Sequence, residues 1–348
     1  MGLEDQARRA YRAVRRYRQP PPAKIRLRDR QTTPPTVYYL CPDYDTPSGG
    51  VRTLYRHVDV LNDAGIPAAL MHHRKGFRCG WFPHRTRVTD VASSPLGPDD
   101  LLVLPETEAR LFPRLPPGLR HLIFNQSGHL TWDVDAERVS RHHRESPDLV
   151  GVLVASEHTR DLLEHAFGQP VHRVRPSVDP LLFAPPERAN GRTISYLPRR
   201  GRSDVENALH ILRARGVLAD WVVDPVDGVP QHEVARRLRA STIFLTCSYQ
   251  EGFGLPAAEA MATGNYVIGF HGYGGREFFD PSYSAPVPTG DLLGLSRTVE
   301  EVLARESAEP GWCFSRGLRA AAHVRAEYSP ERERDSILAA LKSVGFAS

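Results

Sequence analysis

The chain has 348 residues, of which 41% are hydrophobic and 25% charged, as in ordinary globular proteins. Single cores usually stop growing below this length, so two domains are expected. We expect a cytoplasmic protein, because there is no long apolar run and the basic N-terminus lacks the apolar stretch of a signal peptide. The four cysteines are scattered without disulfide or metal spacing, which favours reduced thiols.

The net charge of +4 is concentrated at the N-terminus. Residues 1–30 hold ten Lys/Arg and three Asp/Glu, giving +7, so the rest of the chain, with 35 basic and 38 acidic residues, carries −3. A body without excess positive charge argues against nucleic acid as a partner. Apolar residues at helical spacing from Leu3 to Tyr17 predict a basic amphipathic helix. Two interpretations stay open: a weak contact of residues 1–30 with an anionic membrane, placing the protein peripherally at its inner face, or an arm that is solvated or docked on the body.

From residue 35 onward, short apolar runs alternate with helical periodicity. In chain order, strands are expected at 36–40, 68–71, 101–104, 121–124, 150–154, 193–197, 221–223, 242–245 and 266–270, and helices at 50–64, 157–167, 204–215, 231–240 and 255–263. A proline-rich linker at 180–186 separates two such series. Repeated strand–helix–strand units predict an α/β protein with two doubly wound Rossmann-like domains, whose ligands bind at the carboxyl ends of the strands.

The segment 248–259 carries the strongest functional signal. Gly252 and Gly254 lie in a loop between an expected strand and an expected helix, where exposed backbone N–H groups favour a diphosphate. Glu251 and Glu259 bracket this loop, and carboxylates suit hydrogen bonds from sugar hydroxyls. The alternative is a plain helix start with two acids near its positive end.

This segment resembles the signature of retaining GT-B glycosyltransferases of the family four type, in which two glutamates separated by seven residues bind the donor. The resemblance covers roughly residues 190–330. It implies that Glu259 holds the ribose hydroxyls and that Glu251 is a catalytic residue contacting the transferred sugar. It also implies that the diphosphate lies beside the backbone of Gly252, Phe253, Gly254 and Leu255. His271-Gly-Tyr-Gly-Gly-Arg-Glu277 resembles the family's Gly-Gly-x-Glu turn.

The resemblance extends to the start of the second domain. Tyr196-Leu-Pro-Arg-Arg200 is similar to a subgroup that includes bacterial rhamnosyltransferases, although the usual Gly-Arg-x-x-x-x-Lys-Gly arrangement is absent. It implies that Arg199 first, then Arg200, neutralise the donor diphosphate. The alternative is that Arg199, Arg200 and Arg202 are solvated side chains of a surface loop.

In the first domain, Gly49 and Gly50 follow a strand and open a helix, so their backbone can approach phosphate or acceptor closely. The pattern is not Gly-x-Gly-x-x-Gly, which argues against NAD. Glu106 and Asn125 follow strand ends on the expected acceptor side. The resemblance also places a histidine beside the reacting sugar, for which His129 is the candidate, with a structural role as the alternative.

These expectations combine into one prediction of domains and function. The chain divides into a basic helix and linker (1–34), an acceptor-side domain (35–185), a donor-binding domain (186–328) and a crossover helix returning to the first domain (329–348). The activity implied is metal-independent, retaining transfer of a hexosyl or deoxyhexosyl group from a nucleotide-diphosphate sugar to a hydroxyl acceptor in polysaccharide or glycoconjugate biosynthesis. The acceptor class (a glycan, a lipid-linked glycan or a small molecule) stays open.

No cofactor beyond the donor is expected, and no metal site. Asp43-Tyr-Asp45 and Asp133-Val-Asp135 have the Asp-x-Asp spacing of metal-dependent transferases of another fold, a short pattern that often arises by chance. The alternatives are a non-catalytic protein that binds sugar nucleotides and a GT-B epimerase or phosphorylase.

Overall fold

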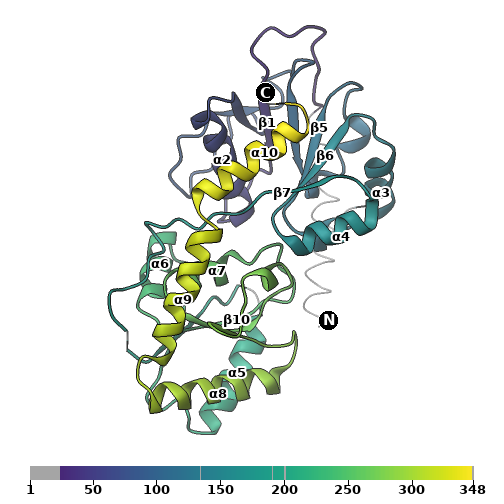
Figure 1. Ribbon diagram of the computed structural model, residues 1–348. Helices are drawn as coiled ribbons and strands as arrows, with labels where there is room; N and C mark the ends of the chain where they lie inside the picture. Colours follow the sequence, from purple (N-terminus) through teal and green to yellow (C-terminus); the bar gives the residue numbers. More distant parts are fainter. Residues whose placement is uncertain (1–23, 134, 190, 200, 347–348) are drawn as a thin grey trace.

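The computed structural model describes residues 24–133, 135–189, 191–199 and 201–346, and these residues form two parallel sheets in two halves of the molecule (Figure 1). The first sheet has the order β3-β2-β1-β4-β5-β6-β7. Its strands are β1 (Val37–Cys41), β2 (Ala68–His72), β3 (Val88–Asp90), β4 (Leu101–Pro105), β5 (His121–Asn125), β6 (Leu149–Val154) and β7 (Val171–Arg173). The predicted N-terminal helix lies outside the described residues.

The second sheet has the order β12-β11-β10-β8-β9. Its strands are β8 (Thr193–Tyr196), β9 (Val222–Pro225), β10 (Ile243–Cys247), β11 (Tyr266–Phe270) and β12 (Ser284–Pro286). The helices are α2 (Gly49–Asp63), α3 (Ala136–Glu145), α4 (Glu157–Phe167), α5 (Arg202–Ala214), α6 (Gln231–Arg239), α7 (Leu255–Ala262), α8 (Leu292–Ala308), α9 (Trp312–Glu327) and α10 (Pro330–Ser343). Short 3₁₀ turns include η3 (Gly128–Leu130) and η4 (Gly274–Glu277). The expected α/β class and doubly wound sheets are confirmed.

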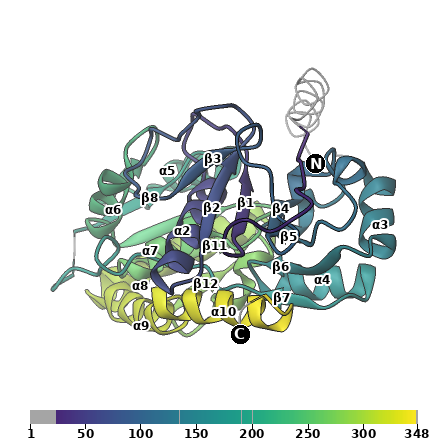
Figure 2. The same cartoon turned by 90° about the horizontal axis from the view of Figure 1, so that it is seen from above.

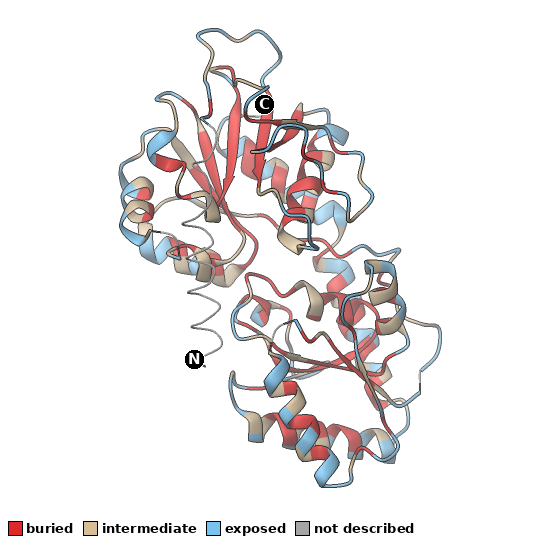
Figure 3. Ribbon diagram, turned by 180° about the vertical axis from the view of Figure 1, so that it is seen from behind, coloured by how far each residue is buried: buried red, intermediate tan, exposed pale blue. Residues whose placement is uncertain are grey.

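Alternation along the central strands explains why helices cover both faces of the second sheet. Successive side chains of a strand point to opposite faces. Ile243 and Leu245 of β10 therefore pack with α5 and α8, whereas Phe244 between them packs with α7 and α9. Strand β10 is buried on both faces, which accounts for its continuous apolar run. Figure 3 shows buried residues along the strands inside both halves of the molecule.

The C-terminal helix returns to the first domain. Helix α9 packs against α7 and β11 of the second domain, and the chain then crosses back, so that α10 packs against α2 and β7 (Figure 1, Figure 2). Ile337, Ala340 and Leu341 of α10 join the core formed around Val37 and Tyr39 of β1. This is the crossover expected from the sequence. Among the residues described, the longest apolar stretches fall short of what a membrane-spanning helix needs.

Three elements of the first domain were not expected from the sequence. Strands β3 and β7 are three-residue edge strands that lack a continuous apolar run. Helix α3 follows its N-cap Asp135, whose carboxylate accepts a hydrogen bond from the Arg138 backbone N–H. One of the two Asp-x-Asp patterns is thus a helix N-cap.

Candidate functional site

The loop between β10 and α7 lies at the carboxyl edge of the second sheet. Strand β10 ends at Cys247, and α7 begins at Leu255 after Gly254, which has a φ of 96°. Pro256 lies in the first turn, where its missing N–H costs nothing. The N-terminus of α7, with its partial positive charge, therefore lies at this loop, as expected for a phosphate site.

This loop meets the first domain at Gly252. A Cβ atom at Gly252 would lie 1.7 Å from the backbone oxygen of Gln126, in the loop after β5. Only glycine allows the two backbones to approach this closely. The amide of the Gln126 side chain donates to the Gly50 carbonyl at 3.3 Å. Gln126 therefore lies between the donor-side loop and the glycine pair of the first domain, a role that sequence reasoning missed.

Glu259 is joined to the first domain by an ion pair. Its residue is 8% exposed, and its Oε1 atom lies 3.3 Å from Nη2 of Arg52 on α2. Burial raises the pKa of Glu259, while the Arg52 guanidinium and the Gln231 side chain oppose this shift. Burial also lowers the pKa of Arg52. A carboxylate accepts up to about four hydrogen bonds, so these two partners leave acceptor capacity for ligand hydroxyls.

Arg199 extends from the loop after β8 to the same place. Its Nη1 atom donates to the Pro47 carbonyl at 3.2 Å, next to the N-cap of α2. A Cβ at Gly49 would lie 3.3 Å from Cδ1 of Leu255, so the starts of α2 and α7 also meet. Arg199, Gly49 and Leu255, all predicted from the sequence, are thus brought together. Arg200 lies outside the described residues.

The predicted acceptor-side residues have different surroundings. His129 in η3 packs with His158 of α4 and Tyr273 of the second domain, with ring centroids 5.7 Å apart in both pairs. Glu106 is buried, and its Oε1 accepts from the backbone N–H of Ser127 at 3.1 Å. Asn125 is 0% exposed and donates to Thr131 at 2.6 Å. The structure therefore places His129 at the domain interface and Asn125 inside the first domain.

Another cross-domain contact is made by Glu277 of η4. Its Oε2 accepts from the backbone N–H of Glu157, at the start of α4, and Oε1 pairs with Arg173 and accepts from Tyr328. Burial raises the pKa of Glu277, opposed by Arg173 and these hydrogen bonds. The Gly-Gly-x-Glu turn therefore holds the second domain against a first-domain helix.

The other Asp-x-Asp pattern has a structural role for its first member. The Asp43 carboxylate accepts hydrogen bonds from the backbone N–H groups of His73 and Arg74 and lies 3.0 Å from Nδ1 of His72. Within the described part of the chain, no group of three or more His, Cys, Asp or Glu residues has the arrangement of a metal site.

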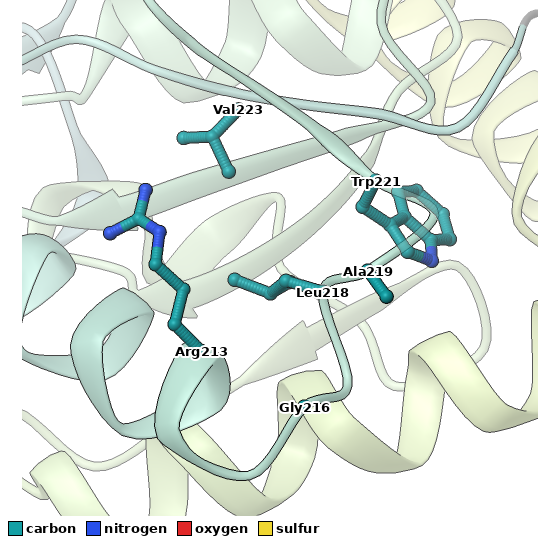
Figure 4. Close-up of a pocket in the computed structure, with 6 residues that line it drawn as sticks. All are labelled: Arg213, Gly216, Leu218, Ala219, Trp221 and Val223. Atoms are coloured by element: carbon teal, nitrogen blue, oxygen red, sulfur yellow. The ribbon is translucent and has the colours of Figure 1, made fainter.

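Figure 4 shows a surface pocket of ≈ 440 Å³ that is separate from this interface. It lies where the end of α5 meets β9, at the edge of the second sheet. One guanidinium lies among the residues that line it, which are Arg213, Gly216, Leu218, Ala219, Trp221 and Val223. None of the predicted site residues contributes to it.

Sequence reasoning also missed Arg52 and Tyr273 as members of the site. Both lie in or beside motifs recognised from the sequence, Arg52 two residues after Gly50 and Tyr273 between two glycines. The sequence signal for Arg52 was a cation one turn into a helix that begins with two glycines. The signal for Tyr273 was a tyrosine in a tight turn, where glycine is favoured.

Two Rossmann-like domains that meet at the carboxyl ends of their strands, with a last helix crossing back to the first, form the GT-B fold of glycosyltransferases. The protein has this fold. Its structure is similar to that of sucrose-phosphate synthase from Thermosynechococcus elongatus, with a TM-score of 0.70 and 17% identity, covering 90% of this chain and 100% of that one. It is also similar to the Anabaena protein HepE in complex with UDP and glucose, with a TM-score of 0.64 and 12% identity, covering 88% and 99% of the two chains.

Sequence comparisons agree with the fold. The model of the family "Glycosyl transferases group 1" matches residues 222–309, which include the loop between β10 and α7. An α-1,6-glucosyltransferase from Actinobacillus pleuropneumoniae serotype 7 (strain AP76) is 26% identical over 188 residues. That match covers 50% of this chain and 53% of the relative, so the chain matches about half of the relative's length.

Proposed function

We propose that this protein is a retaining, metal-independent glycosyltransferase that moves a hexosyl or deoxyhexosyl group from a nucleotide-diphosphate sugar to a hydroxyl acceptor. The observation that carries the proposal is the meeting of Arg199, Glu259 and the start of α7 with the start of α2 at the domain interface. These groups have the chemistry that a nucleoside diphosphate needs: a cation and backbone N–H groups for phosphate, and a buried carboxylate for ribose hydroxyls.

The chemical step separates charge at the leaving group. The bond between the anomeric carbon and the diphosphate oxygen breaks, and its electron pair stays on the diphosphate. Arg199 and the N-terminus of α7 stabilise that negative charge, the kind of interaction that usually contributes most to catalysis. The acceptor oxygen bonds to the anomeric carbon on the face that the diphosphate leaves, and its proton passes to the departing phosphate, which gives retention. Fixed cations here supply the charge that a divalent metal otherwise provides.

The two glutamates have different roles in this proposal. Glu259, deep in the interface, binds the ribose, so its loss weakens nucleotide binding. Glu251, in the middle of the loop, contacts the transferred sugar, so its loss mainly lowers turnover. Glu301 on α8 is exposed and lies away from the interface, which makes it a matched control.

The test has two stages. Thermal shift against UDP, GDP, dTDP and ADP identifies the nucleotide. UDP-glucose is the first donor to assay, because one sequence relative is a glucosyltransferase and one structural neighbour is in complex with UDP and glucose. Release of nucleotide is then measured with a hydroxyl acceptor, with orthophosphate and with neither. Release that requires the hydroxyl acceptor supports transfer. Release that requires orthophosphate indicates a phosphorylase, and binding without turnover indicates a non-catalytic binder.

Variants then test the assignment of residues. Glu259→Gln is expected to weaken nucleotide binding by about 1.5–3 kcal/mol, the contribution of a charged hydrogen bond. Glu251→Gln should retain binding and lose turnover, and Glu301→Gln should behave as wild type. If both interface variants bind and turn over normally, the donor site is elsewhere.

A further inference from the structure

Residues 272–274 form a strained turn. The backbone N–H of Gly274 donates to the Gly272 carbonyl at 2.9 Å, which closes a γ-turn around Tyr273. Tyr273 has φ 66° and ψ −57°, and it is the single non-glycine residue with positive φ in the described part of the chain. γ-turns of this hand are rare and strained, and a bulky side chain at positive φ is an outlier.

The turn lies directly against the loop that carries Glu251. The Glu251 N–H donates to the Gly272 carbonyl at 2.8 Å, and Glu251 and Tyr273 form a parallel β-bridge. A Cβ at Gly272 would lie 2.9 Å from Cγ of Glu251, and one at Gly274 would lie 2.3 Å from the Gly252 carbonyl oxygen. Glycine is required on both sides of Tyr273 by this contact. At position 273 the backbone conformation also favours glycine, yet the residue is tyrosine.

The tyrosine ring crosses to the first domain. Its centroid lies 5.4 Å from that of His158 on α4, with an angle of 25° between the planes. It also lies 5.7 Å from His129, at an angle of 52°. The residue is 40% exposed, so burial of apolar surface alone accounts poorly for a bulky side chain here. Strained residues of this kind concentrate where the strain is part of the mechanism.

We propose that Tyr273 is a positioning residue for the transfer reaction, which makes this inference dependent on the proposed function. Its ring contact with His158 and His129 keeps the γ-turn against the first domain. Through its contact with the neighbouring loop, this γ-turn fixes the backbone of Glu251 and Gly252 at the place where the domains meet. Closure of the reacting site and exclusion of water therefore depend on a side chain that need not touch the nucleotide.

Three variants separate backbone strain from the ring contact. Tyr273→Ala removes the ring and keeps a Cβ at positive φ, Tyr273→Gly removes both, and Tyr273→Phe keeps the ring. At an ordinary position alanine is the more stable of the two small residues. Here the glycine variant should melt above the alanine variant by roughly 2–4 °C. Equal melting temperatures, or a more stable alanine variant, would refute the inference that the backbone at position 273 is strained.

Activity tests the positioning role. Both ringless variants should lower kcat by roughly 10–100-fold through misplacement of Glu251, with the nucleotide Kd within about twofold of wild type. The ratio of donor hydrolysis to transfer should rise in both, since an open site admits water, whereas Tyr273→Phe should keep the wild-type ratio. A merely structural residue does not shift this ratio. Ringless variants with wild-type kcat and hydrolysis ratio would overturn the proposal.

A double-mutant cycle keeps this result separate from the proposed function. Tyr273→Ala and His158→Ala should be less than additive in melting temperature, because each removes the same contact. Tyr273→Ala with His165→Ala, on an exposed face of the same helix, should be additive. A wild-type protein that transfers no sugar would overturn the proposed function and the catalytic role together, whereas the strain and the ring contact are still measured.

Discussion

Besides its apolar packing, the C-terminal helix contacts the first domain through a fully buried carboxylate, that of Glu333. Its two oxygens accept from Nε and Nη2 of Arg56, each at 2.7 Å, and Oε2 also accepts from Ser177 at 2.7 Å. His57 lies 3.7 Å from Oε1. Burial alone would raise the pKa of Glu333, but Arg56 and His57 lower it to about 2, against an ordinary value of 4.5.

This pKa difference sets the size of the effect. A depression of about 2.5 pKa units corresponds to roughly 3 kcal/mol of stabilisation in the ionised form. The pKa in the folded state lies below that in the unfolded state. The contribution is therefore fully present above about pH 4.5 and is lost as the pH falls towards 2. Removing one partner of a buried ion pair typically costs about 3–5 kcal/mol, which agrees in size.

Glu333→Gln is the perturbation, and urea and thermal unfolding are the assays. At pH 7 the variant should lose roughly 3 kcal/mol of unfolding free energy, or roughly 6–12 °C in melting temperature. The difference between wild type and variant should shrink as the pH falls below about 4.5. Glu331→Gln is the matched control, because Glu331 lies in the same helical turn but is exposed, and it should behave as wild type. A variant as stable as wild type at pH 7, or a difference independent of pH, would refute the reasoning.

Four further outcomes are expected. Gly252→Ala should abolish transfer, because its Cβ would lie 1.7 Å from the Gln126 carbonyl oxygen; Gly191→Ala, which meets nothing within 4 Å, is its control, and an active Gly252→Ala enzyme would contradict the contact. Arg199→Ala should lower kcat by about 10²–10³-fold, as loss of a leaving-group donor does, and an unchanged kcat would remove it from the site. Transfer should survive EDTA, and complete loss restored by Mn²⁺ would indicate a metal enzyme. If residues 1–30 bind anionic vesicles, co-sedimentation should disappear at high salt and on their deletion; failure of the full chain to pellet at low salt excludes that interpretation.

Local patterns predicted the fold well where an element has a continuous signal of its own. The central strands are apolar runs of four to six residues. Strand β11 (Tyr266–Phe270) and helix α7 (Leu255–Ala262) agree with the ranges expected from the sequence. The edge strand Val171–Arg173 was missed because its three residues are half-buried and mixed in polarity. Helix α9 was missed as well, since Gly317 lowers its helical propensity. That glycine is needed because a Cβ there would lie 1.9 Å from the Gly264 carbonyl oxygen.

The candidate site shows where local reasoning ends. Glu259 became a candidate through the residue types and spacing of its own segment, and Arg199 through the resemblance to a known family. Their partners were not predictable in this way. Arg52 is 207 residues from Glu259, and Pro47 is 152 residues from Arg199. These pairs arise from the packing of two domains, and the sequence pattern of either domain alone contains no information about which faces meet.

Helix α2 connects the candidate donor site with the crossover helix. Arg52 and Arg56 lie four residues apart and therefore on one face of α2; the first pairs with Glu259 of the second domain and the second with Glu333 of α10. The two pairs differ in strength. Arg56 binds a fully buried carboxylate through two bonds of 2.7 Å, whereas Arg52 makes one contact of 3.3 Å with a carboxylate that retains some exposure. A ribose that competes for Glu259 acts on the weaker pair, so we expect α2 and α10 to stay together as one rigid unit while the second domain moves against them.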